Sequence, residues 1–345
     1  MSETCTWPLP AVATGVGSMP GVEPREAMNI VSGELTDFVP LVELPERGPG
    51  ADSIGRTAAM LTGIDRAFEV ETTPSGWRLG HGDHAIVRRA HAYLSADIDA
   101  LEEFCGARSG PVKVSLVGPW SMAAAVLDPA GEALLRDPGA VTDVAVALGH
   151  AAVELITRVR RATGDAPIVV QIDEDAVPTV LAGRVRTSSG RLTHRSVESS
   201  TVQAHLRTVV DSIHATGARA AIRCFAPAAP VDLLRGTQAD ALAIALNRVE
   251  PEQDALPRAW EAGIGLLLGC VPVRSDIADQ GDTAVSARLR SFMSRHGFVS
   301  VPDNIAITPE EGLAGVDTAT ARAAIAACNR VGAVVREDMD SSRAS

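Results

Sequence analysis

Three acidic residues stand directly after one apolar run of the sequence. Residues 168–172 read IVVQI and are followed by Asp173, Glu174 and Asp175. Side chains alternate between the two faces of a strand, so at least one of these acids must point toward the strand's open end. Asp173 or Glu174 is therefore the leading candidate for a carboxylate that binds a ligand. Capping of a following helix is the alternative.

A glycine-rich turn follows the first apolar run. Residues 14–21 read TGVGSMPG. Glycines let backbone N–H groups approach a ligand closely, and Ser18 with the start of the next helix could hold a carboxylate. Val16, Gly17 and Ser18 are therefore candidate substrate-binding residues. The alternative is a tight turn that merely needs glycine.

Two further runs end in residues that suit a ligand. Glu43 could bind an ammonium group, or it could form a salt bridge with Arg47 or Arg56. Trp120, next to Ser121, offers a flat apolar face to a planar ligand. A tryptophan that only fills the core is equally compatible with the pattern.

The fifth run ends in a cysteine within Arg223-Cys224-Phe225. Cys224 could be a metal thiolate or a nucleophile. No histidine or acid follows it at ligand spacing, which favours a buried structural cysteine. Arg274 and the acids of the segment 308–313, TPEEGL, complete the set of polar residues after apolar runs.

These residues need a scaffold that brings strand ends together. Eight short apolar runs, expected as strands, alternate with longer amphipathic segments, expected as helices. The strands are expected at 11–16, 38–43, 112–117, 168–173, 218–225, 241–246, 263–270 and 304–308. The helices are expected at 24–35, 51–61, 86–104, 140–161, 197–215, 230–234, 251–262, 283–295 and 319–335.

This rhythm predicts an α/β protein with a (β/α)8 TIM barrel, whose functional residues lie where strands end. A doubly wound open sheet is the rival, but Gly15-Val16-Gly17 lacks the third glycine of a dinucleotide fingerprint. Residues 68–73 and 77–80 flank Pro74-Ser75-Gly76 and predict a β-hairpin inserted after strand two. We expect one barrel over 1–336 and a disordered tail over 337–345.

Composition narrows the class of partner. The 345 residues are 46% hydrophobic and 3% aromatic, with a net charge of −12, which disfavours nucleic acid and anionic membranes. We expect no window of about 18 apolar residues that could span a membrane. Residues 1–10 show no export signal. Five scattered cysteines suggest free thiols in the reducing cytoplasm.

Taken in order, three segments resemble the C-terminal catalytic barrel of cobalamin-independent methionine synthase, in the uroporphyrinogen decarboxylase/methionine synthase-like superfamily. They are TGVGSMP at 14–20, QIDE at 171–174 and TPEEGL at 308–313. The resemblance spans residues 14 to about 315. It implies the same barrel and a small-molecule substrate, because this family transfers a methyl group from a folate to the thiol of homocysteine.

The resemblance also implies roles for individual residues. Residues 16–18 would contact the carboxylate of the amino acid, and Asp173 and Glu43 would hold its ammonium group, with Glu174 beside them. Trp120 would stack on the pterin of the methyl donor, next to Ser121.

The zinc site departs from the family pattern. The family binds zinc through a His-x-Cys pair, a Glu and a Cys, whereas this chain has a degenerate locus. Arg223-Cys224-Phe225, Leu246 and Glu311 stand at those positions, and Arg274 stands near that of the catalytic histidine. Tetrahedral zinc needs more soft donors than one cysteine, and Arg223 would repel it. We expect no tightly bound zinc and no other tightly bound cofactor.

Three functions remain open. The first is a methionine synthase-like S-methyltransferase with a folate or corrinoid donor, in which Arg223 or Arg274 stabilises a thiolate. The second is a non-catalytic homologue that binds an amino acid or folate, or pairs with an active paralogue or another copy of itself. The third is lyase or decarboxylase chemistry on an acidic substrate, which rests on analogy of fold alone.

Overall fold

Eight parallel strands form a single curled sheet in the computed structural model, which describes residues 12–80, 84–106, 108, 110–249, 255–274, 277, 282–298 and 304–343. The strand order is β1-β10-β9-β8-β7-β6-β5-β2. Their bounds are β1 Val12–Ala13, β2 Val39–Pro40, β5 Val112–Val117, β6 Ile168–Asp173, β7 Arg219–Arg223, β8 Ala241–Ala245, β9 Gly265–Val271 and β10 Ile305–Pro309.

The sheet closes between its first and last strands just beyond their carboxyl ends. Ser18 and Glu43 form an isolated parallel bridge. Glu43 N donates to Gly17 O over 3.0 Å, and Met19 N donates to Glu43 O over 2.8 Å. The TIM-barrel-like fold expected from the alternation of elements is therefore confirmed, and its closing seam lies at the carboxyl-terminal end of the strands.

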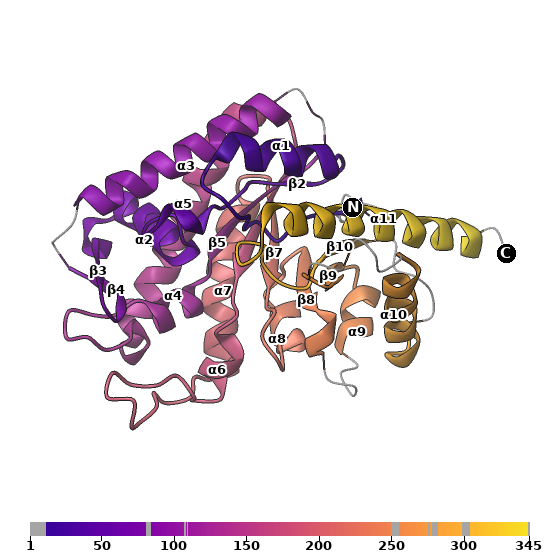
Figure 1. Cartoon of the computed structure of the whole chain (residues 1–345). Coiled ribbons are helices and arrows are strands. Elements are labelled where there is room, and N and C mark those ends of the chain that lie inside the picture. Colours follow the sequence, from indigo (N-terminus) through magenta and orange to yellow (C-terminus); the bar gives the residue numbers. More distant parts are fainter. Residues whose placement is uncertain are drawn as a thin grey trace.

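Helices cover the outside of the sheet (Figure 1). Each strand lies within or close to its expected run, although β1 and β2 are only two residues long. The helices are α1 Pro24–Glu34, α2 Ser53–Ile64, α3 His84–Cys105, α4 Pro119–Ala125, α5 Pro138–Thr163, α6 Val177–Leu181, α7 Ser199–His214, α8 Val231–Arg235, α9 Ala255–Glu261, α10 Asp282–Arg295 and α11 Thr318–Arg343.

The expected hairpin is present as β3 (Val70–Thr73) and β4 (Gly76–Leu79), paired antiparallel between α2 and α3. Its turn uses Gly76 at φ 115°, a conformation that favours glycine. Trp77 donates from Nε1 to Asp52 Oδ1 over 3.1 Å, and Asp52 also caps α2. The hairpin is thus fastened to the first turn of α2, beside the barrel mouth.

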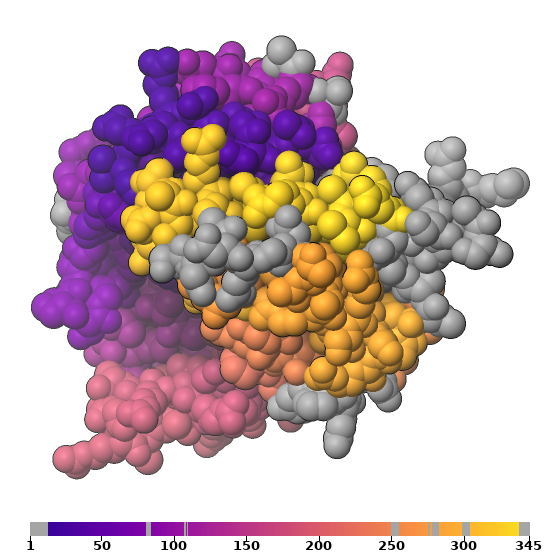
Figure 2. Space-filling model, turned by 45° about the vertical axis from the view of Figure 1, so that its right-hand side comes forward, coloured from indigo at the N-terminus to yellow at the C-terminus, as the bar shows by residue number. Residues whose placement is uncertain are grey.

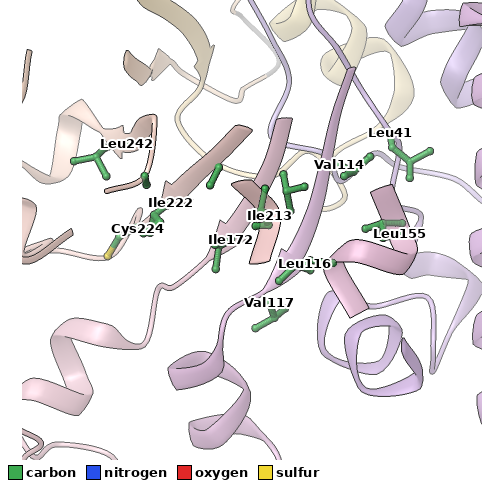
Figure 3. Packing of buried hydrophobic residues seen from close by; sticks show 14 of the residues in the cluster. Leu41, Val114, Leu116, Val117, Leu155, Ile172, Ile213, Ile222, Cys224 and Leu242 are labelled. Atoms are coloured by element: carbon green, nitrogen blue, oxygen red, sulfur yellow. The ribbon is translucent and has the colours of Figure 1, made fainter. Parts of the chain in front are cut away.

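Alternation along the strands separates two apolar layers. Val169, Ala221 and Ala243 belong to a small cluster inside the barrel. Ile172 and Ile222 belong to the large cluster between strands and helices, which Figure 3 shows together with Cys224. The side chain next to an inward one therefore faces the helices, and this rule decides which candidate residues reach the mouth.

Helix α5 is long and apolar enough to cross a membrane, contrary to the expectation that no such window exists. However, 56% of its apolar window is buried, and the helix packs against α7, α2, α3 and α4. It is a core helix of the barrel, whose apolar residues serve these contacts.

Three details differ from the sequence-based expectation, and one is the short helix α6, which was not expected. Helix α4 was not anticipated, because Gly118-Pro119 reads as a turn, yet proline is well suited to the first position of a helix. Helix α11 runs to Arg343, so it continues into the segment expected to be disordered. Figure 2 shows α11 lying between α1 and α10, and these contacts support the helix from both sides.

Candidate ligand site at the barrel mouth

A cavity of about 310 Å³ lies at the carboxyl ends of the strands, where the turns after β1, β2, β6, β7 and β10 meet. This volume falls at the low end of the range for small-molecule sites, about 300–1,000 Å³. Its walls are lined by Val16, Ser18, Glu43, Pro45, Asp52, Ser53, Asp173, Arg223, Gly312, Ala314 and Gly315. Four of the candidate residues, Val16, Ser18, Glu43 and Asp173, therefore converge on one space.

Asp173 and Arg223 form the charged pair of this cavity. They lie opposite each other on neighbouring strands, and Arg223 Nε donates to Asp173 Oδ1 over 2.8 Å. Arg223 Nη1 also donates to Asp175 Oδ2 over 2.9 Å. Burial lowers the pKa of Arg223, but the two carboxylates outweigh it and hold that pKa above its usual range. The guanidinium is therefore a permanent cation at the mouth.

One oxygen of Asp173 is left for a ligand. Oδ1 accepts from Arg223 and from Gln171 Nε2, the latter over 2.8 Å. Among the residues that the structure describes, none donates a hydrogen bond to Oδ2. Since a carboxylate oxygen is a strong acceptor for ammonium groups, this oxygen is suited to a ligand cation.

Beneath the cavity lies Lys113, the single lysine of the chain beside 30 arginines. It is 1% exposed, and its Nζ donates to Gln171 Oε1 over 2.5 Å and to Val16 O over 3.3 Å. An ionised carboxylate can only accept, so Gln171 presents its amide hydrogens to Asp173 and its oxygen to Lys113. Lys113 thereby connects the Val16 turn with Asp173.

Burial lowers the pKa of Lys113 to about 7, because desolvation outweighs the attraction of Asp173 and Glu43. Sequence reasoning missed this residue. The signal was available, since the only lysine of the chain stands inside an apolar strand, PVKVSLV at 111–117.

Glu43 is buried and paired with Arg56, the second of the two partners considered from the sequence. Arg56 Nη2 donates to Glu43 Oε1 and, over 2.7 Å, to Ser115 O. Their side chains are 5% and 7% exposed. Burial raises the pKa of the Glu43 carboxyl, while Arg56 opposes that rise. Glu43 lines the cavity, but it is neutralised by Arg56 before any ligand arrives.

The turn after β1 forms another part of the cavity wall. Gly17 has φ 138°, in the region that favours glycine, and an added Cβ would lie 3.4 Å from Glu43 Oε1. Leu313 N donates to Ser18 O over 3.2 Å. A Cβ at Gly312 would lie 2.4 Å from Ser18 Oγ, so glycine is required for this close approach. Three distant segments are thus fitted together around the cavity.

Three other candidate residues lie outside this cavity. Glu174, adjacent to inward-facing Asp173, is completely buried and accepts hydrogen bonds from Trp120 N, Ser121 N and Ser121 Oγ over 2.8–2.9 Å. Burial raises its pKa to about 8, against the lowering effect of these donors. It caps the first turn of α4, which precedes it in the sequence, whereas the alternative considered from the sequence was capping of a following helix. Trp120 is 2% exposed and stacks on His205.

The residues of the degenerate zinc locus do not converge. Arg223 faces the cavity and Phe225 belongs to the inner cluster, with Arg223 5.2 Å above its ring. Cys224 faces the helices, is fully buried, and has its thiol pKa raised to about 12 by burial (Figure 3). Leu246 lines a different pocket, and Glu311 is exposed.

Zinc therefore does not fit the residues present. Over the described part of the chain, no group of three His, Cys, Asp or Glu side chains is placed to hold a metal ion. The inward positions are those of Arg223 and Phe225, and neither a guanidinium nor a phenyl ring can coordinate zinc. Arg274 is exposed and does not line the cavity.

A closed ring of eight parallel strands with its cavity at their carboxyl ends defines the TIM-barrel-like class. No protein-family model and no curated protein sequence matches the chain. Among solved structures, a B12-independent methionine synthase from Shewanella sp. W3-18-1 in complex with selenomethionine matches over 96% of this chain and 99% of its own. The TM-score is 0.62 at 13% identity.

A second similar structure, Dispersin B, has a TM-score of 0.46 at 8% identity, over 95% of this chain and 99% of that one. The methionine synthase match confirms the fold that the three sequence segments led us to expect. At this level of identity, it defines the architecture of the chain.

Proposed function

We propose that the mouth cavity binds a small α-amino acid of the homocysteine or methionine type. The observation that carries this proposal is that no described residue donates a hydrogen bond to Oδ2 of Asp173, which lines the cavity together with Val16 and Ser18. Oδ2 would accept from the ligand's ammonium group. The turn of residues 16–18 would receive its carboxylate.

The similar methionine synthase supports an amino-acid ligand, because that protein was determined with selenomethionine bound. The resemblance of the three sequence segments points to the same ligand class. Neither the structural match nor the sequence resemblance identifies the side chain of the amino-acid ligand. Homocysteine and methionine are therefore the first compounds to test.

Isothermal titration calorimetry with methionine and homocysteine tests the proposal. Asp173→Asn should weaken binding at least about tenfold, because a charge-assisted hydrogen bond contributes about 1.5–3 kcal/mol. Asp165→Asn makes the same chemical change at an exposed residue away from the cavity and should leave affinity unchanged. No heat with either amino acid, or equal affinity in both variants, would contradict the proposal.

On this proposal the chain is an S-methyltransferase of the methionine synthase kind, with homocysteine or a related thiol as acceptor and a folate or corrinoid as donor. The thiol would lose its proton to solvent beside the Arg223 cation, without zinc. A free thiol has a pKa of about 8.5, so the rate of methyl transfer should be low at neutral pH, rise toward pH 9 and be unaffected by chelators.

The four described cysteines are free, which supports a cytoplasmic location.

The outward orientation of Cys224 favours a second candidate, a binding protein without catalysis. A chain that retains the amino-acid cavity but has no thiol activator would bind its ligand and leave it unchanged. Assays with methyltetrahydrofolate and with methylcobalamin distinguish the two. Methionine formed from homocysteine by wild type, and lost in Asp173→Asn, supports the enzyme; binding without turnover supports the binding protein.

A further inference from the structure

A second cavity, of about 660 Å³, lies away from the mouth cavity, and the two share no lining residue. It is enclosed by α4, the first turns of α5 and α7, and the loop between α6 and α7. Figure 1 shows this loop below α4, next to the segment that precedes α5. The volume is in the middle of the range for small-molecule sites, about 300–1,000 Å³.

The inner side of this cavity presents a planar, uncharged ring. His205 stacks on Trp120 with ring centroids 5.1 Å apart and an interplanar angle of 17°. Trp120 is almost fully buried, so a ligand would meet His205 rather than the indole face. Burial lowers the pKa of His205, which keeps the imidazole neutral near pH 7. Buried Leu135 and Val141 add apolar walls.

Polar groups without partners point to a ligand. The side chain of His194 is 8% exposed, and its Nε2 has no hydrogen-bond partner. The nearest carboxylate oxygen, on Glu132, is 3.7 Å away, beyond hydrogen-bond reach. His205 Nδ1 is also buried and unpaired. Buried polar atoms are nearly always satisfied in native proteins, so this pair calls for an acceptor or donor in the cavity.

The charged residues that line this second cavity favour an anionic ligand. Arg195 is exposed and has no partner among the described residues, while Arg136 is held 3.1 Å from Asp128. Glu198 is the sole carboxylate among the described residues that line the cavity. Arg195 is therefore the cation left to receive a negatively charged group.

The wall formed by the loop is itself fastened. Ser188 donates from both its backbone N, over 3.0 Å, and its hydroxyl to the carboxylate of Glu132. Thr187 N donates to Leu192 O over 3.0 Å, which makes the loop a small hairpin. Because these contacts already order the loop, binding of a ligand would cost little additional conformational entropy there.

We propose that this cavity is a second ligand site that takes a small aromatic carboxylate, with its ring against His205 and its carboxylate on Arg195. This inference goes beyond amino-acid binding at the mouth and does not depend on it. The His194 imidazole would complete the site by hydrogen bonding to the same carboxylate.

Calorimetry with 2-naphthoate and its uncharged analogue 2-naphthamide tests this site. Wild type should bind naphthoate more tightly than naphthamide. Arg195→Gln should weaken naphthoate binding about tenfold, the loss of one charge-assisted contact, and leave naphthamide binding unchanged. Arg191→Gln, in the same loop but outside the lining, is the matched control and should change neither affinity. Thr201→Trp, at an exposed position of the lining, should fill the cavity and abolish both.

The proposal is overturned if naphthoate gives no heat with wild type, if naphthamide binds as tightly, or if Arg191→Gln weakens naphthoate as much as Arg195→Gln. Methionine should bind these variants as tightly as it binds wild type. If wild type binds naphthoate but not methionine, the proposal for the mouth cavity fails and the proposal for this second cavity stands.

Discussion

Arg223 Nε lies 2.8 Å from Asp173 Oδ1, across two neighbouring strands at the barrel mouth. This one contact has two consequences. It places a permanent cation where the resemblance to methionine synthase implies a zinc ligand, and it orients Asp173 so that Oδ2 remains free for a ligand. On the proposed function, this arrangement would bind the ammonium group of an amino acid, and the Arg223 cation would disfavour a metal ion.

The Arg223–Asp173 pair should contribute strongly to stability. Its side chains are 15% and 13% exposed, so Arg223→Met would leave a nearly buried carboxylate with fewer partners. We expect a loss of about 3 kcal/mol in the free energy of unfolding, measured by urea denaturation. The control is Arg258→Met, whose pair with Asp232 is half exposed on both sides; it should cost under about 1 kcal/mol. Equal losses would show that burial of the pair is unimportant.

Lys113 should make stability depend on pH. Its pKa is lowered in the folded chain to about 7, so the unfolded chain binds the proton more readily between pH 7 and 10. Stability from this group therefore rises with pH across that window, by at most about 1.4 kcal/mol per pH unit, and is constant below it.

The measurement is urea unfolding of wild type and Lys113→Met at pH 7 and pH 9.5. Buried cysteines titrate in both proteins, so the difference between the two isolates Lys113. Wild type should gain more stability than the variant on going to pH 9.5. A parallel change in both proteins would mean that Lys113 is not held in its uncharged form.

The NMR signal of the Lys113 side chain should also change when a ligand binds at Asp173, although Lys113 does not contact that ligand. Because it is the only lysine, labelling with ¹⁵N-lysine gives a side-chain signal that needs no assignment. Methionine bound at Asp173 should shift this signal through Gln171, whose amide joins the two residues. Gln171→Leu should remove the shift while the variant remains folded. An unchanged signal in wild type saturated with methionine would show that the hydrogen-bonded chain does not connect to the ligand.

Gly17 should be required at the turn after β1. At φ 138°, alanine is strained, and its Cβ would approach Glu43. We expect Gly17→Ala to cost about 1–3 kcal/mol of stability and to weaken methionine binding by displacing the turn. The matched control is Gly33→Ala in α1, where nothing lies within 4 Å of the added Cβ. Alanine there should be neutral or stabilising by up to about 1 kcal/mol; a similar loss at both positions would contradict the role of φ.

Much of the architecture was predictable because apolar residues recur at a different spacing in strands and in helices. The run of acids at 173–175 also predicted a carboxylate at the mouth, and the alternation of strand β6 explains why it is Asp173 and not Glu174. Which of the two faced inward depended on the register of the sheet, which no local pattern contains. Closure of the barrel rests on the Ser18–Glu43 bridge, since β1 and β2 themselves do not pair.

The residue missed by sequence reasoning is one that acts through burial. Lys113 is a charged side chain in a strand, and sequence alone does not show that it is buried. Trp120 shows the converse case. Its position after a strand end suggested contact with a planar ligand, but Val202 O accepts its indole N–H over 3.1 Å and His205 covers a ring face.

The central claim is that the mouth cavity binds an amino acid without zinc. The most direct test is calorimetric titration of methionine into protein stripped of metal by a chelator, repeated after addition of stoichiometric zinc. The account predicts binding of one methionine per chain with the same affinity in both samples. Binding that appears only after zinc is added would contradict it.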